Sequence, residues 1–349
     1  MTAAIPPAIP AIDVAALFGP ASRERDAADR AILDAASASG FMTVGGMPAS
    51  VPHGAAARAA LLRVFALDEP ARHALLRQKF APERPNVYRG WFPLQHGTAT
   101  YKEGIDMGPD VAHAGLGLDP ADPLTEPTPL PPEAALPGWR AAVAAYYRGM
   151  EELGRMLMRA VARGTGLPET FFDPYFAGGI STLRLIRYPV RTDASLAGAD
   201  PDAVTIAHEG ARRTLIGAPH VDSGFVTLLA QDGVGGLQAR GRDGGAWLDV
   251  PPAEGTLAVN FGGLLERWTG GRIRATEHRV VSPGIERFSI PFFYEPRVDA
   301  AIAPLPLPGA ARFEPFLYGD HLWAAMMRFV EFQGLEAKRP PRGGARSAA

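Results

Sequence analysis

The stretch GAPHVDSGFVTLL places His220 and Asp222 two residues apart, beside a run of strand-forming residues. Side chains at positions i and i+2 of a β-strand point to the same face of the sheet, so one strand could present both groups to a metal ion. A third ligand must come from elsewhere: His278 in ATEHRVVS is the leading candidate and His208 in IAHEG the alternative. Two histidines and one carboxylate on one face of an octahedron leave three positions open, as is typical of non-haem Fe(II) oxygenases.

A candidate carboxylate clamp follows in the segment RFS, where Arg287 and Ser289 again alternate along a predicted strand. A guanidinium beside a hydroxyl is suited to hold a carboxylate, and burying the guanidinium without an anion would be costly. If Pro283-Gly284 formed a two-residue hairpin loop, His278 would lie opposite Ser289, although Pro-Gly suits a type II turn better than the hairpin turns. The pattern predicts that metal site and clamp lie in one region.

Simpler interpretations compete with these hypotheses. A His-x-Asp pair alone can arise by chance, and a hydrolytic zinc site also uses two histidines and a carboxylate. Such a zinc site does not require an Arg-x-Ser clamp, so the combination favours iron. The segment DGVGG at 232–236 is predicted to be a turn rather than a phosphate loop, because no helix or lysine follows it. Ordinary surface or helix roles are expected for the remaining histidines, His53, His73, His96, His113 and His321.

The composition is that of an ordinary globular protein. The 349 residues include 35 Lys+Arg and 37 Asp+Glu, which gives a formal net charge of −2, and no basic run stands out. We therefore expect neither nucleic acid nor an anionic membrane as a partner, but a small-molecule substrate.

The chain contains no cysteine, which excludes disulfides, thiolate nucleophiles, iron–sulfur clusters and cysteine-type zinc sites. No apolar run approaches the ~18 residues that a membrane span needs. The N-terminal segment MTAAIPPAIPAIDV lacks the basic start and long apolar stretch of a signal peptide. We expect a cytoplasmic protein that is a monomer or a weak homo-oligomer.

The elements that must position these groups are predicted from periodicity and end signals. Residues 22–39 are expected to form a helix, with Ser22 as its N-cap and Gly40 at its end. The strongest helical periodicity covers residues 139–164. Shorter helices are predicted at 54–66, 69–78 and 320–334, and short strands in IPAIDVAAL, at a sheet edge, and in FMTVGG.

From residue 180 onward the pattern changes to short strands separated by turns, in ISTLRLIRYP, PHVDSGFVTLLAQ, GTLAVNFG, RATEHRVVS and RFSIPFFYE. The segment GGLQARGRDGGAWLDV predicts a hairpin with an Asp-Gly turn. Many closely spaced short strands predict a sandwich, barrel or jelly roll. Residues 80–138 have little regular pattern, but their aromatic residues favour an ordered, functional segment.

The combined pattern is similar to the isopenicillin N synthase-like family of Fe(II)/2-oxoglutarate-dependent dioxygenases. The resemblance rests on PHVDSGFVTLL, GLQ followed by WLDVPP, GTLAVNFG, LLERWTGG, EHRVV and RFSIPFFYEP, and it covers about residues 8–334. It implies a mainly β fold with flanking helices around a double-stranded β-helix (jelly-roll) core. The implied segments are an N-terminal α/β dioxygenase region at 8–115, a connecting segment with the long helix at 116–178, the jelly-roll core at 179–298, a C-terminal helical segment at 299–338 and a disordered tail at 339–349.

The resemblance also implies an enzyme and its cofactors. Expected is an oxidoreductase of secondary metabolism that uses Fe(II), 2-oxoglutarate and O2 to oxidise, most simply to hydroxylate, an unactivated C–H bond of a small molecule. The implied iron ligands are His220, Asp222 and His278. The implied 2-oxoglutarate-binding residues are Arg287, Ser289 and Tyr188.

Substrate contacts are expected from the 80–138 segment, the C-terminal helix and the end of the core, because loops on a rigid scaffold commonly carry specificity. The candidates are Tyr88, Trp91, Phe92, Tyr101, Lys102, Arg184 and Phe293. The basic residues Lys102, Arg184 and Arg187 could together bind an acidic substrate.

Departures from the family pattern leave alternatives open. Ile186 stands where plant members often carry an asparagine that contacts 2-oxoglutarate, and Gly263 and Gly270 replace residues that are frequent in the family. The segment LIRYP also resembles the isopenicillin N synthase branch, which uses no 2-oxoglutarate and whose Arg-x-Ser pair binds the substrate's carboxylate. An Fe(II) oxidase of that type is one alternative, and a non-catalytic jelly-roll ligand-binding protein is another.

Overall fold

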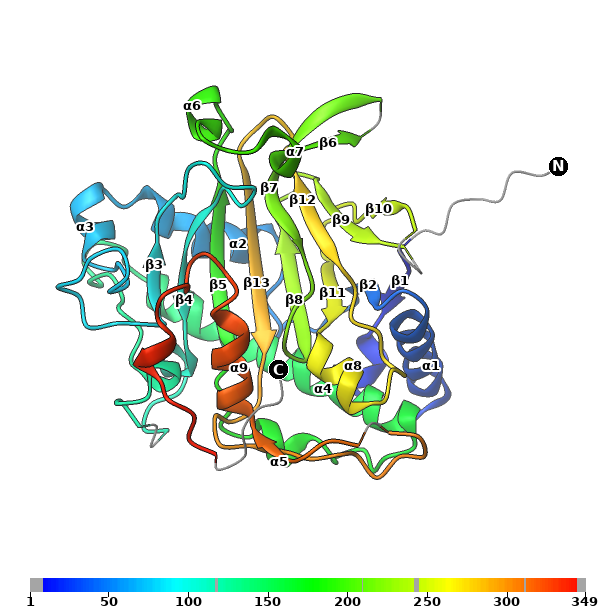
Figure 1. Cartoon of the computed structure of the whole chain (residues 1–349). Helices are drawn as coiled ribbons and strands as arrows, with labels where there is room; N and C mark the ends of the chain where they lie inside the picture. The colour runs from blue at the N-terminus through cyan, green and yellow to red at the C-terminus, as the bar shows by residue number, and fades with distance from the viewer. Residues whose placement is uncertain (1–8, 117–118, 209, 242–244, 311, 344–349) are drawn as a thin grey trace.

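Two β-sheets carry the fold in this computed structural model, which describes residues 9–116, 119–208, 210–241, 245–310 and 312–343 (Figure 1). In spatial order, the strands of the eight-stranded sheet are β1 (Ala11–Asp13), β2 (Phe41–Gly45), β11 (Leu257–Phe261), β8 (Val226–Gln231), β13 (Arg287–Tyr294), β5 (Thr182–Tyr188), β4 (Glu103–Met107) and β3 (Gly90–Phe92). Those of the five-stranded sheet are β10 (Trp247–Asp249), β9 (Leu237–Arg240), β12 (His278–Val281), β7 (Ala211–His220) and β6 (Thr205–His208). A further pair joins β14 (Ala301–Ile302) to β15 (Phe316–Leu317).

Helices flank these sheets. They are α1 (Arg23–Ala38), α2 (Ala55–Leu62), α3 (Glu69–His73), α4 (Trp139–Thr165), α5 (Asp173–Phe176), α6 (Asp193–Leu196), α7 (Pro201–Val204), α8 (Gly263–Trp268) and α9 (Tyr318–Met326). Short 3-10 turns cover Ala15–Phe18, Arg63–Ala66, Pro109–Val111, Pro123–Thr125 and Glu336–Lys338. The predicted mainly β jelly-roll with flanking helices is confirmed. In the described part of the chain, no helix is both long and apolar enough to cross a bilayer.

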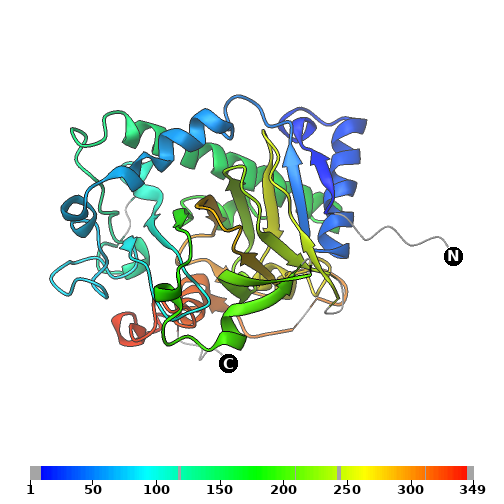
Figure 2. The ribbon, with the colours of Figure 1, turned by 90° about the horizontal axis from the view of Figure 1, so that it is seen from above.

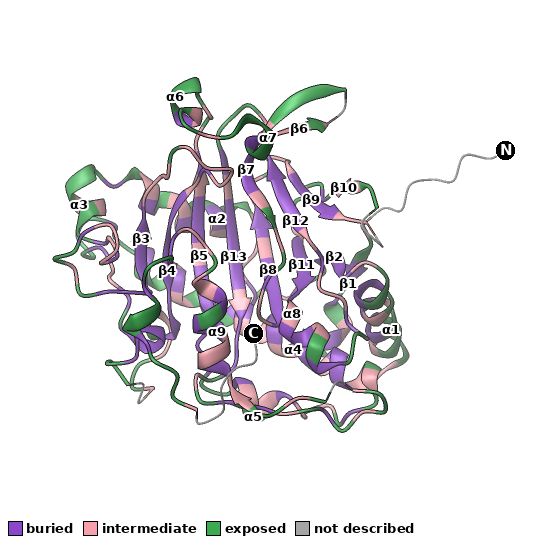
Figure 3. Cartoon of the chain, in the orientation of Figure 1, coloured by how far each residue is buried: buried purple, intermediate pink, exposed green. Residues whose placement is uncertain are grey.

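The long helix α4 covers one side of the large sheet, and α9 lies on the opposite side (Figures 1 and 2). The buried face of α4 includes Tyr146, Met150, Leu153 and Leu157, three or four residues apart as one face of a helix requires. Gly154 lets the helix approach β13 closely, because a Cβ there would lie 2.6 Å from Cγ of Tyr294. The strands between the layers are almost wholly buried (Figure 3). The interior strand β13, which carries Arg287 and Ser289, is thus held in a packed core.

Capping and turn residues predicted the ends of α1 and the β9–β10 hairpin. The Ser22 side chain accepts a hydrogen bond from the Arg25 backbone N–H (3.2 Å), and Gly40 takes a left-handed φ of +66° next to Arg274 O, as the predicted cap and end of α1 require. β9 pairs with β10 as the predicted hairpin, whose Asp-Gly turn lies outside the described residues. The predicted edge strand is confirmed as β1, which is shorter than its segment and pairs in parallel with β2.

Two predicted helices are shorter than expected. The prediction at 69–78 is confirmed only as α3, and the prediction at 320–334 is confirmed only over α9. Beyond Met326 the chain continues as turns, in which Phe329 approaches the His220 ring edge-on and Phe332 stacks on Tyr88. These tertiary contacts outweigh helix propensity in the C-terminal segment.

The expectation of little regular structure in residues 80–138 was wrong at two places. β3 and β4 extend the large sheet at the edge of β5. The segment EGIDM of β4 contains a single residue that favours strands, Ile105, but its acids meet arginines of the neighbouring strand. Arg187 Nη1 donates to Glu103 Oε1 (2.9 Å), and Arg184 Nε donates to Asp106 Oδ1 (2.6 Å). These cross-strand ion pairs allow a polar sequence to be buried in the sheet.

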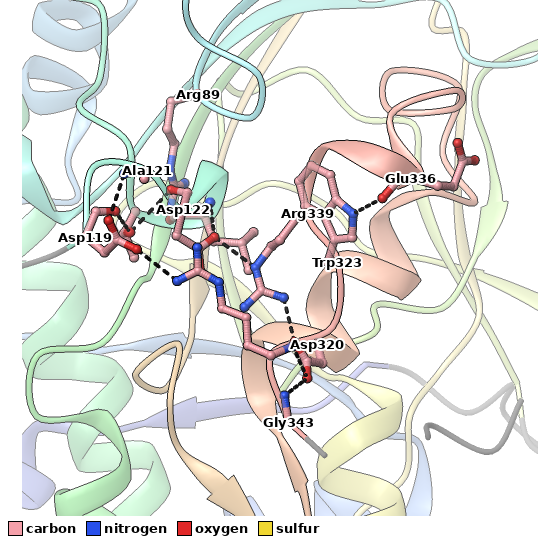
Figure 4. A network of polar contacts seen from close by, with 12 residues as sticks. Arg89, Asp119, Ala121, Asp122, Asp320, Trp323, Glu336, Arg339 and Gly343 are labelled. Atoms are coloured by element: carbon pink, nitrogen blue, oxygen red, sulfur yellow. Dashed lines mark hydrogen bonds and ion pairs between the residues drawn. The ribbon is translucent and has the colours of Figure 1, made fainter. Parts of the chain in front are cut away.

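The expected disordered tail at 339–349 needs correction over its first five residues. Arg339 is 3% exposed and donates to Asp122 Oδ1 (2.8 Å) and Asp320 Oδ1 (2.7 Å) (Figure 4). Asp320 also accepts a hydrogen bond from the Gly343 backbone N–H (2.8 Å). Proline and glycine in this stretch suggested disorder, but the buried Asp122 and the partly exposed Asp320 bind the arginine. Residues 344–349 lie outside the described residues.

An Arg339→Ala substitution is expected to lower the free energy of unfolding by about 3 kcal/mol, because it removes the buried cation of Asp122 and leaves only the partly exposed Arg342 beside this buried carboxylate. Urea denaturation of the purified protein measures this loss. Arg342 is the matched control, since its side chain is 41% exposed and water screens its charge, so Arg342→Ala should cost much less. Equal effects of the two substitutions would contradict the structural role of Arg339.

Candidate metal centre and carboxylate clamp

The end of β7 and the start of β12 bring the two histidines together. His220 and His278 face each other in the antiparallel register, with their ring centroids 4.3 Å apart. Asp222 Oδ1 lies 3.7 Å from His220 Nε2 and 3.8 Å from His278 Nε2. One ligand atom from each of the three residues lies within 4.8 Å of the others, which is compact enough to surround one metal ion. The structure therefore assembles the predicted triad.

The supporting argument from strand alternation was wrong. β7 ends at His220, and Asp222 lies in the loop between β7 and β8. Its carboxylate is held in place by neighbours rather than by strand geometry. Asn260 Nδ2 on β11 donates to Asp222 Oδ2 (2.8 Å), and Thr227 Oγ1 on β8 donates to the same oxygen. Oδ1 is thereby left to face the histidines.

Backbone carbonyls fix the tautomer of both histidines. His220 Nδ1 lies 2.8 Å from Ala218 O, and His278 Nδ1 lies 3.1 Å from Thr276 O. A carbonyl oxygen only accepts, so each Nδ1 must carry the proton and each Nε2 presents its lone pair. Second partners of this kind orient the imidazoles of metal sites.

The charges of the triad also suit a divalent cation. Burial, with a smaller contribution from His278, lowers the pKa of His220 to about 4, so its ring is neutral at pH 7. Burial acts to raise the pKa of Asp222, but His278 and His220 and the two hydrogen bonds from Thr227 and Asn260 bring it below its ordinary value. Neutral imidazoles and an ionised carboxylate are the protonation states that metal binding requires.

Sequence reasoning did not identify Asn260 and Thr227 as parts of the site, although an asparagine in the apolar strand LAVNF was a usable signal. An Asn260→Ala variant is expected to bind Fe(II) roughly 10–100-fold more weakly, because Asp222 loses an orienting hydrogen bond. Anaerobic Fe(II) titration measures the affinity. Asn86→Ala is the matched control, since this buried amide donates instead to Pro127 O. The control should bind Fe(II) as the wild type does. Wild-type Fe(II) affinity in the Asn260→Ala variant would exclude an orienting role for Asn260.

The candidate clamp lies on β13 beside β5. Arg287 is fully buried, and no carboxylate among the described residues pairs with it. Its Nε donates to Gly235 O (3.1 Å), its Nη2 donates to Gln231 Oε1 (3.2 Å), and its guanidinium lies over the Tyr188 ring. Arg287 Nη1 and Ser289 Oγ, on the same face of the strand, are buried without a hydrogen-bond partner in the part of the chain that the structure describes.

The two buried atoms without a partner among the described residues, Arg287 Nη1 and Ser289 Oγ, indicate whether the site suits a carboxylate ligand. A buried guanidinium without an anion is costly, and so is a buried hydroxyl without a partner. A ligand carboxylate would satisfy both Arg287 Nη1 and Ser289 Oγ and would neutralise the charge. The residues present therefore fit the distal carboxylate of 2-oxoglutarate, and the triad fits Fe(II).

The predicted hairpin between His278 and Ser289 was wrong. β12 pairs with β7 and β9 in the small sheet, whereas β13 pairs with β5 and β8 in the large sheet. The Pro283-Gly284 turn therefore lies on a crossing between sheets, with Gly284 at a φ of +79°. His278 faces His220 rather than Ser289. The clamp is linked to the metal site through Tyr188, which lies under the Arg287 guanidinium and lines the same cavity as His220 and Asp222. The alternative ligand His208 instead contacts Gln238 and Asp249 on the β9–β10 hairpin.

A cavity of about 610 Å³ opens onto His220 and Asp222. Its wall includes four of the predicted substrate residues, Tyr88, Lys102, Arg184 and Phe293, and also Tyr188. The segment 328–333 after α9 closes another part of the wall, as expected for the C-terminal region, although it is not helical. Thr182 and Glu295 line the cavity as well and were not predicted. A second hollow, of about 590 Å³ beside α4, contains no residue of the triad.

Three predicted substrate residues do not line this cavity. Trp91 is buried against Phe65, with ring centroids 5.4 Å apart, and Phe92 is fully buried between the guanidinium groups of Arg77 and Arg184. Tyr101 is buried beneath the guanidinium of Arg191. These aromatic side chains pack the 80–138 segment onto the core. Arg187, proposed to bind an acid, pairs with Glu103 and Glu286 outside the cavity.

Comparisons with known proteins agree with this geometry. The model of the 2OG-Fe(II) oxygenase superfamily matches residues 183–296. The proline hydroxylase buaE of Petromyces alliaceus is 31% identical over 70% of this chain and 76% of its own length. Isopenicillin N synthase of Streptomyces clavuligerus is 29% identical over 93% of this chain and 97% of its own length.

Solved structures give the same result. A full-length Neurospora crassa protein in complex with alpha-KG and 5-formyluracil superposes with a TM-score of 0.73 at 25% identity, over 92% of this chain and 95% of that chain. The dioxygenase for auxin oxidation from rice superposes with a TM-score of 0.65, also at 25% identity, over 94% of this chain and 99% of that chain. The chain therefore belongs to the isopenicillin N synthase-like part of the 2OG-Fe(II) oxygenase superfamily, and it is an oxidoreductase that uses Fe(II), 2-oxoglutarate and O2.

Proposed function

We propose that the protein hydroxylates an unactivated C–H bond of a small molecule bound in the 610 Å³ cavity. The observation that carries this proposal is the joint presence of two groups of residues. His220 and Asp222 of the compact His-Asp-His triad line the cavity, and β13 carries a buried arginine and a buried hydroxyl whose polar atoms lack partners among the described residues. Relatives named as hydroxylases and 2-oxoglutarate-dependent dioxygenases support the reaction type.

In this proposal His220, Asp222 and His278 hold the iron through two Nε2 atoms and Oδ1. When bound, iron together with 2-oxoglutarate and O2 supplies the oxidising power that breaks the C–H bond. Arg287 Nη1 and Ser289 Oγ bind the distal carboxylate of 2-oxoglutarate, and Tyr188 packs against the guanidinium. The protein's contribution is to hold these groups still in a site shielded from water.

The cavity wall determines which C–H bond is exposed to the iron. Tyr88, Lys102, Arg184 and Phe293 are the proposed substrate contacts, together with the segment 328–333. Positioning decides the outcome, because the same chemistry can lead to hydroxylation, desaturation or ring closure. Hydroxylation is proposed because it needs no further group from the protein.

Succinate formation from 2-oxoglutarate tests this function. Fe(II)-loaded protein should form succinate slowly alone and faster with a substrate, and 18O2 should place one labelled oxygen atom in a hydroxylated product. A His278→Ala variant should form none, whereas His208→Ala should match the wild type. Substrate oxidation that proceeds without 2-oxoglutarate would instead indicate an oxidase in which Arg287 holds the substrate. Failure to bind iron would leave a jelly-roll ligand-binding protein.

We also propose a setting for this activity. The protein is proposed to work in secondary metabolism in the cytoplasm, on a small-molecule substrate, as a monomer or weak homo-oligomer. The formal net charge of −2 supports a small molecule rather than a nucleic acid or an anionic membrane as partner. The chain has no cysteine, so its fold does not depend on an oxidising compartment.

A further inference from the structure

Five charged residues form a cluster at the cavity wall: Arg77, Asp106 and Glu331, which are buried, and Lys102 and Arg184, which are partly exposed. Arg184 binds Asp106 through two hydrogen bonds, of 2.6 Å from Nε and 2.8 Å from Nη2. Arg77 also donates to Asp106, and Lys102 Nζ lies 3.2 Å from Glu331 Oε1. Lys102, Arg184 and Glu331 face the cavity directly. We refer to these five residues as the charge cluster.

The charge cluster is not neutral. Its three cations face two acids, which leaves one positive charge in excess. Burial acts to raise the pKa of Glu331, but Lys102 and Arg184 bring it to about 2. Glu331 is therefore already counted as an anion and cannot offset the remaining positive charge. Arg77 Nη1 is buried without a hydrogen-bond partner. An uncompensated buried charge is unfavourable, so the cluster is suited to receive an anion.

The neighbouring groups do not remove this excess. Glu295 is the next acid on the cavity wall, and burial raises its pKa to about 7, so about half of its population is neutral at that pH. It also lies close to another buried cation, Arg89. Arg328 on the cavity wall adds a positive charge instead.

Lys102 has the donors to bind the missing anion. An ammonium group has three N–H donors, and Glu331 is the one acid among the described residues that pairs with Lys102. Arg184 already donates hydrogen bonds to Asp106 from two of its nitrogens. Lys102 also lines the same cavity as the metal-site residues His220 and Asp222. A ligand carboxylate on Lys102 would thus lie within a small molecule's length of the iron.

The rest of the cavity suits an apolar body. Phe293 of β13 lines the cavity, and Phe329 and Phe332 come from the C-terminal segment. An ammonium group near the charge cluster would face three cations, so a zwitterion is disfavoured. The favoured occupant has one carboxylate and an aromatic or branched aliphatic remainder.

We propose that the substrate is an apolar monocarboxylic acid whose carboxylate binds Lys102, which makes Lys102 the specificity-determining residue. This inference rests on the proposed function, because it places the acid beside the same iron site. With the acid bound, the charge cluster and its ligand would have three positive and three negative charges.

Matched acids and amides test the proposal without any turnover. The protein is loaded with Fe(II) and saturating 2-oxoglutarate under anaerobic conditions, so that the Arg287 clamp is occupied. Calorimetry then compares phenylacetate, hydrocinnamate and isocaproate with their primary amides. At least one acid should bind about tenfold more tightly than its amide, as expected for one charge-assisted hydrogen bond. Equal affinities within every pair, or no binding by any acid, would overturn the proposal.

Two substitutions separate recognition from structural support. Lys102→Met and Glu331→Gln both break the Lys102–Glu331 ion pair, but only the first removes the ammonium group. Lys102→Met should abolish the preference for acid over amide, whereas Glu331→Gln should keep or strengthen it. Loss of the preference in both variants would show that the ion pair merely holds the C-terminal segment in place.

Binding of 2-oxoglutarate distinguishes a failure of the proposed function from a failure of the Lys102 proposal alone. Both variants should bind 2-oxoglutarate as the wild type does, because Lys102 and Glu331 do not contact Arg287 or Ser289. If the wild type fails to bind 2-oxoglutarate, the proposed function fails and this inference with it. If 2-oxoglutarate binds but acids and amides bind equally, only this inference fails.

Discussion

Replacing Asp222 with alanine is expected to weaken Fe(II) binding by more than about a hundredfold and to abolish succinate formation. The substitution removes the only carboxylate of the triad, and even the loss of a supporting hydrogen bond in such sites costs roughly 10–100-fold in metal affinity. It also leaves Asn260 and Thr227 without the oxygen to which they donate. Anaerobic Fe(II) titration of the purified variant measures the loss.

A nearby acid provides the matched control for this experiment. Asp249 lies 3.9 Å from His208, the alternative ligand considered from the sequence, so it belongs to a second His-Asp pair of similar separation. An Asp249→Ala variant should bind Fe(II) as the wild type does, because neither residue of that pair belongs to the triad. Comparable losses in both variants would mean that iron binds elsewhere or nonspecifically.

Replacing Arg287 with methionine is expected to weaken 2-oxoglutarate binding by about a hundredfold, while Fe(II) binding stays close to that of the wild type. The estimate corresponds to the loss of about 3 kcal/mol, in the range of hydrogen bonds between charged groups. Ser289→Ala should cost less, about tenfold, because it removes a single hydroxyl donor. Anaerobic calorimetry with 2-oxoglutarate measures both values.

The Arg287 variant should also fold well, which makes it a clean test. The guanidinium is buried without an acid partner among the described residues, so methionine removes an unfavourable buried charge and keeps much of the volume. Arg187→Met is the control on the neighbouring strand, where the arginine pairs with Glu103 and Glu286 outside the cavity. Unchanged 2-oxoglutarate affinity in Arg287→Met would assign this arginine to another ligand.

The sequence was informative where function depends on residue type and spacing. The pattern His-x-Asp, followed by a distant histidine, selected three residues that the structure assembles into a compact triad. The Arg-x-Ser pair selected two residues whose buried polar atoms have no hydrogen-bond partner among the described residues. Local signals also located the ends of α1, since Ser22 and Gly40 act through their immediate neighbours. Such features depend on a few neighbouring residues, so they can be predicted without knowledge of the tertiary structure.

The sequence was less informative where distant segments meet. The position of Asp222 depends on Asn260 and Thr227, which come from two other strands. The order of the buried tail residue Arg339 depends on Asp122, more than two hundred positions earlier. β4 is a strand because its acids meet arginines of β5, not because of its own propensity. Long-range partners of this kind override local preferences and are not visible in local periodicity.

The substrate contacts show the same limit. Aromatic residues of the 80–138 segment looked equally suited to packing or to binding, and the structure divided them: Tyr88 lines the cavity, whereas Trp91 and Phe92 are buried in the core. Which of residues 328–333 line the cavity could not be predicted, because these residues were predicted to form a helix and instead form turns.

The most direct measurement is an anaerobic titration of Fe(II)-loaded protein with 2-oxoglutarate, monitored by the visible charge-transfer absorption of the iron–2-oxo acid chelate. We expect a saturable absorption band in the wild type and in Asp249→Ala. We expect no band in Asp222→Ala, and in Arg287→Met a band that needs about a hundredfold more 2-oxoglutarate. Tight iron binding without any band in the wild type would contradict 2-oxoglutarate as the ligand of Arg287 and Ser289.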